Sequence, residues 1–193
     1  MPKWVNSTSP HFHQVKLVQS GDETAVAAAK ELVKEYVRSL NIDLSFQGID
    51  RELDEFPADY VPPRGALFVA LAGKKLAGVV ALRMVSTKTC EMKRMYVREE
   101  FRGRGIGRNL AELLIDEASR RGYSRMRLDT LSTMKEAIGL YCSLGFREIA
   151  PYRFNPIRGA TYMELQIGPK RGRAAKFAEV SRDRRYAPDL GQP

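Results

Sequence analysis

The residues with the clearest chemical potential form the segment FRGRGIG, residues 101–107, in which arginines alternate with glycines. Glycines let main-chain amides come close to an anion, and arginines add positive charge around it, so the segment predicts a phosphate-binding turn. Its spacing differs from the dinucleotide motif, because Gly103, Gly105 and Gly107 are evenly spaced. It also lacks the Gly-Lys-Ser or Gly-Lys-Thr of a P-loop. A solvated turn without a ligand is the alternative that this segment alone leaves open.

The cysteines and histidines predict neither a metal site nor a disulfide framework. Cys90 and Cys142 are the two cysteines of the chain, and they lack a Cys-x-x-Cys spacing. His11 and His13 lie together without other ligands nearby in the sequence, whereas a zinc site needs three or four ligands. We therefore expect chemistry without a bound metal.

Length and composition fit one domain with additional chain at both ends. The 193 residues are 44% hydrophobic, and no apolar run approaches the roughly 20 residues of a membrane-spanning helix. The first residues lack the apolar core of a signal peptide, so a cytoplasmic location without a membrane partner is expected. We expect an N-terminal extension over 1–13, a domain over 14–168 and a C-terminal tail over 169–193.

Positive charge is concentrated near the C-terminus. The chain carries a formal net charge of +9, and residues 168–193 supply +4 through seven lysines and arginines against three acids. This tail has no apolar periodicity, which predicts disorder. A contact with nucleic acid or a membrane is the alternative. The tail lacks the interleaved aromatic side chains of a nucleic-acid platform, so nucleic acid is not the expected partner.

Hydrophobic periodicity predicts alternating strands and helices along the domain. Strands are expected over 11–19, 90–97, 124–130, 146–150 and 160–167, and two more form a hairpin about a turn at 73–75. Helices are expected after a cap at Ser20 or Asp22, over 49–56, over 106–121, and from a capping box at 133–136 to Gly145. The crossover at 90–130 makes part of the sheet parallel, and the hairpin makes part antiparallel. This order predicts an α/β fold with one central mixed sheet of about seven strands flanked by helices.

Two segments resemble the signatures of one known family. Residues 102–107 match the Arg/Gln-x-x-Gly-x-Gly/Ala motif of the GNAT family, the Gcn5-related N-acetyltransferases, and lie between a strand and a helix as in that family. About thirty residues later, AIGLYCSLGF over 137–146 is similar to the family's Ala-x-x-Leu-Tyr-x-x-x-Gly-Phe. Together with the element order, the resemblance covers about residues 14–168. It implies that the phosphates belong to acetyl-CoA as cosubstrate, and that an acetyl group moves to a primary amine of a small molecule or peptide.

The resemblance also assigns residues to this cosubstrate. It implies that acetyl-CoA is bound by Met95, Val97, Arg102, Gly103, Arg104, Gly105, Ile106, Gly107 and Arg108. A bulge near Met95 in the strand over 90–97 would leave main-chain amides free for the reacting carbonyl oxygen. Many family members have a cofactor-binding asparagine seven residues before the motif's tyrosine. This chain has Met134 there, so no contact is carried over to that position.

Glu91 receives a catalytic role from the resemblance. It lies eleven residues before Arg102, as does the glutamate that accepts a proton from the attacking amine in the lysine-acetylating branch of the family. The alternative is a strand glutamate paired with Lys93 or Arg94 at the surface. In a regular strand Glu91 and Lys93 would share one face with residues 95 and 97.

Tyr141 receives the second catalytic role. It matches the family's tyrosine, which protonates the departing sulfur, although its place in a helical stripe of apolar residues also allows a purely structural position in the core. Cys142 follows it and suggests a covalent acyl-enzyme. Because no histidine beyond His13 is present to activate this thiol, direct transfer is the expected route.

The acceptor is the least specified part of the prediction. Residues 41–63 hold six acids against one arginine, a balance of −5. This predicts either an acidic rim that attracts a cationic amine or an exposed and solvated helix face. Three other functions stay open: a CoA-binding sensor without turnover, a basic nucleic-acid-binding protein, and a transferase for another acyl group such as succinyl. The resemblance also allows a homodimer.

Overall fold

The computed structural model describes residues 5–6, 13–18, 21–63 and 65–168. They form one sheet with the strand order β1-β2-β3-β4-β5-β6-β8-β7. The strands are β1 (Val5–Asn6), β2 (His13–Leu17), β3 (Gly65–Ala72), β4 (Lys75–Met84), β5 (Thr89–Val97), β6 (Arg125–Leu131), β7 (Arg147–Ile149) and β8 (Ala160–Gln166). Strands β2 to β8 confirm the expected mixed sheet, and the short β1 adds an edge from within the N-terminal extension. The predicted tail over 169–193 lies outside the described residues.

The helices alternate with the strands as expected. They are α1 (Glu23–Leu40), α2 (Ile49–Asp54), α3 (Ile106–Arg120) and α4 (Lys135–Ser143), with the short 3-10 turns η1 (Ser45–Gln47), η2 (Ala58–Tyr60) and η3 (Glu99–Phe101). Asp22 caps α1, because its Oδ1 accepts a hydrogen bond from the amide of Ala25 at 3.1 Å. No helix of the described chain is long and apolar enough to cross a membrane.

The predicted capping box at the start of α4 is wrong. Helix α4 begins at Lys135 after Met134, and no side chain caps it. Main-chain hydrogen bonds close the preceding turn, from the amide of Met134 to the carbonyl of Leu131 and from the amide of Lys135 to that of Thr133. These bonds place the helix start beyond the residue that the box would have used as its cap.

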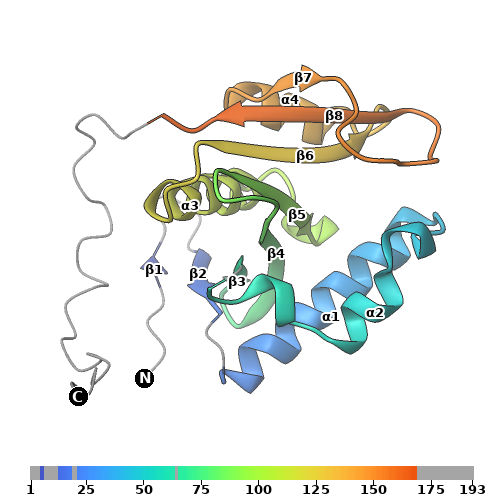
Figure 1. The fold of residues 1–193 in the computed structure, drawn as a ribbon. Coiled ribbons are helices and arrows are strands. Elements are labelled where there is room, and N and C mark those ends of the chain that lie inside the picture. The colour runs from blue at the N-terminus through green and yellow to red at the C-terminus, as the bar shows by residue number, and fades with distance from the viewer. Residues whose placement is uncertain (1–4, 7–12, 19–20, 64, 169–193) are drawn as a thin grey trace, which may run out of the picture.

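One parallel pair interrupts an otherwise antiparallel set of described strands. β5 and β6 run parallel and are joined by α3, as the crossover predicted, whereas β2 to β5 and β6 to β8 pair antiparallel. In Figure 1 the strands β6, β7 and β8 lie with α4 above β3 to β5, and α1 and α2 lie together below. The parallel pair β5–β6 therefore joins two antiparallel parts of the sheet, β2 to β5 and β6 to β8.

Two apolar cores cover the two faces of the sheet. Apolar side chains of α3, including Leu110 and Leu114, pack on one face together with Tyr141 and Phe146 from the α4 region. Helix α1 packs on the other face through side chains that include Leu32. Burial of such side chains is the main stabilising contribution to the fold. The helices on both faces confirm the expected layering.

Candidate active site

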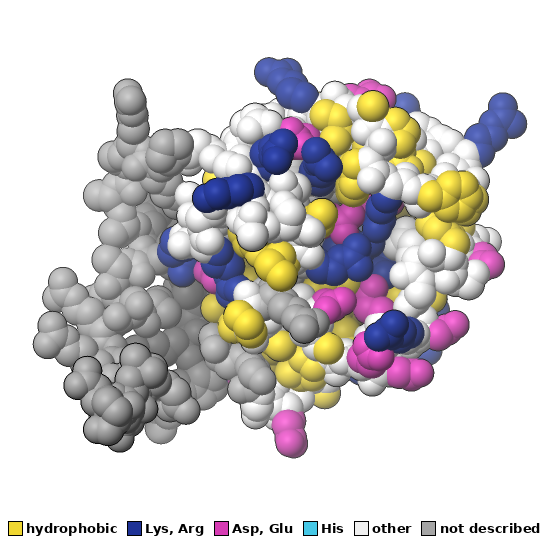
Figure 2. Space-filling model, viewed as in Figure 1, with side chains coloured by type: hydrophobic (Ala, Val, Ile, Leu, Met, Phe, Trp, Pro, Cys, Tyr) yellow, Lys and Arg dark blue, Asp and Glu magenta, His cyan; other side chains and the backbone are white. Residues whose placement is uncertain are grey.

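A cavity opens where β5 and β6 separate. Their parallel pairing runs from Thr89 opposite Arg125 to Glu91 opposite Arg127, and stops there although both strands continue. The cavity has a volume of about 830 Å³ and is lined by the last residues of both strands, by α1, η1, α4 and the turn before α3. Figure 2 shows Lys, Arg, Asp and Glu side chains gathered near the middle of this face. The split strands therefore bring charged and apolar groups to one open cavity.

A β-bulge shapes the cavity side of β5. Val79 pairs with Tyr96 and Ala81 with Lys93, so β5 has one residue more than β4 across this interval. Arg94 lies within the bulge and has a left-handed backbone conformation with φ of 54°. This confirms the bulge expected near residue 95. Beyond residue 91, the main-chain groups on the β6 side of β5 have no strand partner within the described chain. The carbonyl of Val97 accepts a hydrogen bond from Arg102, and this side of the strand is otherwise open to a ligand.

The bulge also corrects the expected direction of the β5 side chains. Met92 before the bulge and both Met95 and Val97 after it pack in the α3 core, whereas Tyr96 packs in the α1 core. Because the extra residue shifts the alternation by one, Lys93 does not share a face with residues 95 and 97. The prediction of one shared face, which assumed a regular strand, is wrong.

The glycine–arginine turn precedes α3 directly. Gly103 and Gly105 have positive φ of 73° and 78°, and no atom outside their immediate neighbours would lie within 4 Å of an added Cβ. Gly105 is the N-cap of α3, with no side-chain cap, so the first amides of the helix point outward unpaired. Such a cradle fits the pyrophosphate of CoA, because the amides and the helix dipole both favour an anion.

The arginines of the turn divide into two groups. Arg102 and Arg108 line the cavity, and their guanidinium groups are held by the carbonyl of Val97 at 3.1 Å and the hydroxyl of Ser143 at 2.7 Å. Arg104 does not line the cavity and stacks over the ring of Phe101, 5.5 Å from its centroid. The other residues predicted to bind the cosubstrate all line the cavity: Met95, Val97, Gly103, Gly105, Ile106 and Gly107.

Tyr141 lies at the boundary between the core and the cavity. It is buried in α4, its ring packs at a tilt against that of Phe146 with centroids 5.8 Å apart, and it lines the cavity. Burial raises the pKa of its phenol above the ordinary value of 10, and a phenol is protonated at neutral pH at either value. A protonated phenol is the form that can donate a proton. The structure thus combines the two positions that the sequence allowed, in the core and at the site.

Glu91 lies beside the cavity and not on its wall. Only 1% of its surface is exposed, and its carboxylate accepts hydrogen bonds from the guanidinium of Arg83 and the hydroxyl of Tyr152, both at 2.7 Å. Arg153 adds an ion pair at 3.4 Å. Burial alone would raise the pKa of Glu91, but Lys93 and the two arginines lower it overall. Glu91 is therefore a buried carboxylate with three partners, and the surface pairing with Lys93 or Arg94 is not what the structure shows.

The end of the cavity away from the turn contains residues that the sequence did not single out. Lys93 lines it and donates a hydrogen bond to the side-chain oxygen of Gln47 at 3.2 Å. Asp129 from β6 also lines it and accepts hydrogen bonds from Arg153 and Asn155. Tyr36, Leu40, Ile42 and Leu44 form an apolar part of the same wall. Lys93 and Asp129 are distant in sequence, and only the arrangement of the strands brings them together.

The segment over 41–63 contributes Ile42, Leu44 and Gln47 to the wall of this cavity, but not its acids. None of its six acids is a lining residue, and Asp43, Asp50, Asp54, Glu55 and Asp59 are exposed. The sixth, Glu52, binds Arg94 through both carboxylate oxygens at 2.7 and 2.6 Å. The exposure of five of these acids agrees with a solvated face, and the attraction of a cationic amine by an acidic rim stays a prediction.

Comparison with known proteins identifies the family. The model of the acetyltransferase (GNAT) family matches residues 29–146. The chain belongs to the GNAT family. An uncharacterized N-acetyltransferase of Schizosaccharomyces pombe is 41% identical over 155 residues, which cover 79% of this chain and 92% of the relative. The N-acetylaspartate synthetase of Danio rerio is 31% identical over 135 residues, covering 68% of this chain and 48% of the relative.

Solved structures agree with the GNAT fold. An acetyltransferase from Streptococcus agalactiae aligns with a TM-score of 0.65 at 21% identity, covering 80% of this chain and 98% of that one. A Bacillus subtilis acetyltransferase, solved in complex with CoA, aligns with a TM-score of 0.55 at 22% identity, covering 79% of this chain and 97% of that one. The family and its relatives make this protein an N-acetyltransferase.

Proposed function

We propose that this protein transfers an acetyl group from acetyl-CoA to the primary amine of a small molecule or peptide by direct attack. The observation that carries the proposal is the continuity of one cavity from the glycine–arginine turn to Tyr141 and the bulge of β5. The CoA complex of the Bacillus subtilis structure supports the cosubstrate. The product named for the Danio rerio relative, an acetylated amino acid, supports a small amine as acceptor.

Different residues along the cavity would bind different parts of acetyl-CoA. Bound acetyl-CoA supplies a thioester carbonyl that is open to an amine and a sulfur that departs with the bond's electrons. The turn over 102–108 would hold the phosphates, and the main chain at Met95 and Val97 would hold the pantetheine arm. Free amides at the bulge would stabilise negative charge on the carbonyl oxygen. Cys142 is exposed and does not line the cavity, which supports direct transfer.

Tyr141 would donate its hydroxyl proton to the departing sulfur. Its place on the cavity wall supports this role, and its phenol is in the protonated form that a donor needs. The amine must lose its own proton before or during attack. The role of Glu91 as the acceptor of that proton, directly or through water, stays a prediction.

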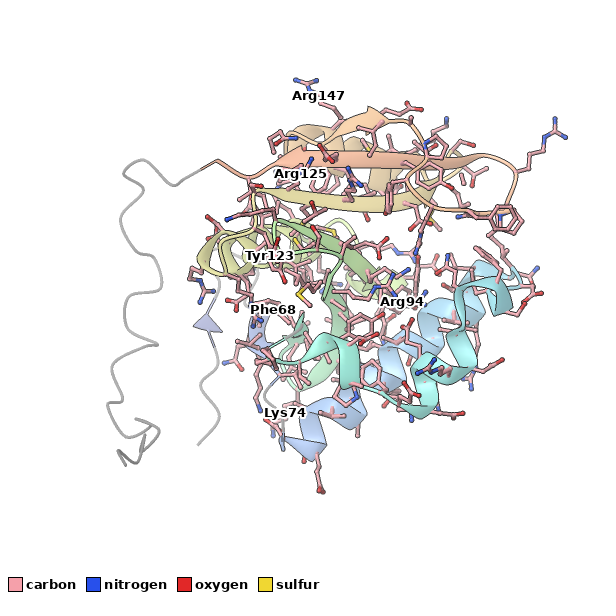
Figure 3. All side chains as sticks on the ribbon, viewed as in Figure 1. Phe68, Lys74, Arg94, Tyr123, Arg125 and Arg147 are labelled. Atoms are coloured by element: carbon pink, nitrogen blue, oxygen red, sulfur yellow. The ribbon has the colours of Figure 1, made fainter. Side chains whose placement is uncertain are left out.

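Free-thiol release from acetyl-CoA with a panel of amines tests this function. Tyr141→Phe should lower kcat by about 10²- to 10⁴-fold, the usual contribution of a general acid, with acetyl-CoA affinity near wild type. Tyr123→Phe is the matched control, since Tyr123 is a buried tyrosine of the same core outside the cavity lining (Figure 3). Equal turnover of the two variants would remove Tyr141 from the mechanism. Absence of transfer to every amine tried would contradict the proposed function.

A further inference from the structure

A buried lysine lies at the end of the cavity away from the glycine–arginine turn, which we name the acceptor end, and it forms no ion pair with a described residue. Lys93 is 5% exposed and lines the cavity on the face opposite α3. Its ammonium donates to the neutral side chain of Gln47 at 3.2 Å. Among the described residues no carboxylate lies within ion-pair distance of it. A buried ammonium in this state is costly, because burial removes water and the nearby carboxylates of Glu91 and Asp129 act on it only from beyond ion-pair distance.

The charged groups around Lys93 already form ion pairs with one another. Each of the three neighbouring arginines is paired with an acid: Arg83 with Glu91, Arg94 with Glu52, and Arg153 with Asp129 and more distantly with Glu91. Four cations therefore face three acids, and the positive charge left over is that of Lys93. Figure 3 shows Arg94, the labelled member of this group, between β5 and the α1–α2 layer. The acceptor end therefore carries one uncompensated positive charge.

Lys93 is charged under ordinary conditions. Burial lowers the pKa of its ammonium to about 8, partly opposed by the charge of Glu91, so the protonated form dominates at pH 7. An anionic group entering the cavity would gain a charge-assisted hydrogen bond, which is stronger than a neutral one. Gln47 has a side-chain NH₂ in addition to the oxygen that Lys93 contacts, and this could donate to the same anion.

We propose that the acceptor is a small amine that carries a carboxylate, and that Lys93 together with Gln47 binds this carboxylate. The inference rests on the proposed function and names its substrate class. Lys93 is adjacent to the bulge at Arg94, so a carboxylate held there leaves the amine of an amino acid close to the proposed reaction point. The apolar wall of Leu40, Ile42 and Leu44 gives room for the rest of the molecule.

The test compares acceptors that differ only in the carboxylate. Thiol release from acetyl-CoA is measured with the standard amino acids, β-alanine and 4-aminobutyrate, and with the carboxamide of each. We expect transfer in the carboxylate series, with kcat/KM at least about tenfold above that of the matching carboxamide. Putrescine and lysine-containing peptides without free carboxylates serve as acceptors of the opposite chemistry.

Variants at the proposed carboxylate site separate binding from chemistry. Lys93→Met should raise KM for the carboxylate acceptor by about ten- to a hundredfold and abolish the preference over the carboxamide. Gln47→Glu changes almost no volume but places an acid on the same ammonium, so it should have the same effect. Lys93→Arg should keep the preference because it keeps the charge. Lys88→Met, in the exposed turn before β5, is the matched control and should behave as wild type.

The outcomes distinguish this inference from the function on which it rests. Equal use of carboxylates and carboxamides, or an unchanged preference in both Lys93→Met and Gln47→Glu, would overturn it. Transfer confined to amines without a carboxylate would also overturn it, while leaving N-acetyl transfer intact. Failure of acetyl-CoA to bind, or no transfer to any amine, would overturn the proposed function itself. Melting curves of each variant show that the fold is retained.

Discussion

The ion pair between Arg94 and Glu52 ties α2 to the bulge of β5, and its removal gives a sharp prediction. Arg94 has a left-handed backbone, and its side chain is 3% exposed. The Glu52 side chain is 14% exposed and binds the guanidinium through both oxygens. Glu52→Gln keeps the shape of the acid but removes its charge. The Arg94 guanidinium then remains buried beside a neutral amide.

The magnitude follows from burial. Removing one partner of a buried ion pair costs about 3–5 kcal/mol, because the remaining charge is not compensated. Glu52 is partly reachable by water, so we expect the lower end, about 3 kcal/mol. For a chain of this length each kcal/mol shifts Tm by about 2–4 °C, so Glu52→Gln should melt about 6–12 °C below wild type.

Thermal melting and urea denaturation measure this difference, and helix α2 supplies its own control. Arg51 and Glu55 form the same kind of pair at 2.8 Å, but their side chains are 80% and 55% exposed. Exposed ion pairs contribute little to stability, so Glu55→Gln should have the Tm of the wild type. A Glu52→Gln protein that also melts with wild type, within ~2 °C, would refute the reasoning that Arg94 depends on a buried charge partner.

Three further predictions concern the turn, the predicted base and acid stability. Gly105→Glu should abolish acetyl-CoA binding by adding bulk and negative charge at the cradle. Gly107→Ala should retain binding, because its Cβ would meet side chains only at 3.6 Å and beyond, and calorimetry separates the two. Glu91→Gln should lower kcat at neutral pH if Glu91 is the base, because its lowered pKa keeps the carboxylate ionised and able to accept a proton there, and a wild-type kcat would contradict that role. Glu52 and Glu91 are buried, which raises their pKa, but neighbouring cations lower it overall. Their contribution to stability is therefore present above about pH 4.3 and lost as pH falls through their folded pKa, and a urea midpoint unchanged between pH 5 and 3 would contradict it.

The local parts of the site could be predicted from the sequence. The glycines at 103, 105 and 107 encode a turn and a helix start through backbone freedom, which depends on adjacent residues only. The hairpin about residues 73–75 and the cap at Asp22 are local in the same way. The position of Tyr141 near the end of a helix could be predicted, because the motif over 137–146 fixes its distance from Gly145, which follows α4.

The acceptor end could not be predicted, because its contacts join distant segments. Lys93 meets Gln47 across 46 residues, and Arg94 meets Glu52 across 42 residues. No periodicity in β5 indicates these partners. The bulge at Arg94 also reverses the side-chain alternation, so a regular strand assigned residues 95 and 97 to the face of Glu91. The surplus positive charge of Lys93 can be inferred only from the structure, because the structure shows that the neighbouring arginines are paired with acids.

Calorimetric titration with acetyl-CoA tests the central claim most directly. Wild type and Gly105→Glu are titrated with acetyl-CoA, dephospho-CoA and NAD. The account predicts one site with a micromolar Kd for acetyl-CoA on the wild type, no comparable binding of NAD, and loss of the acetyl-CoA signal in Gly105→Glu. No binding of acetyl-CoA at ~1 mM, the upper end of typical KM values, would contradict the assignment of the turn and its cavity to the cosubstrate.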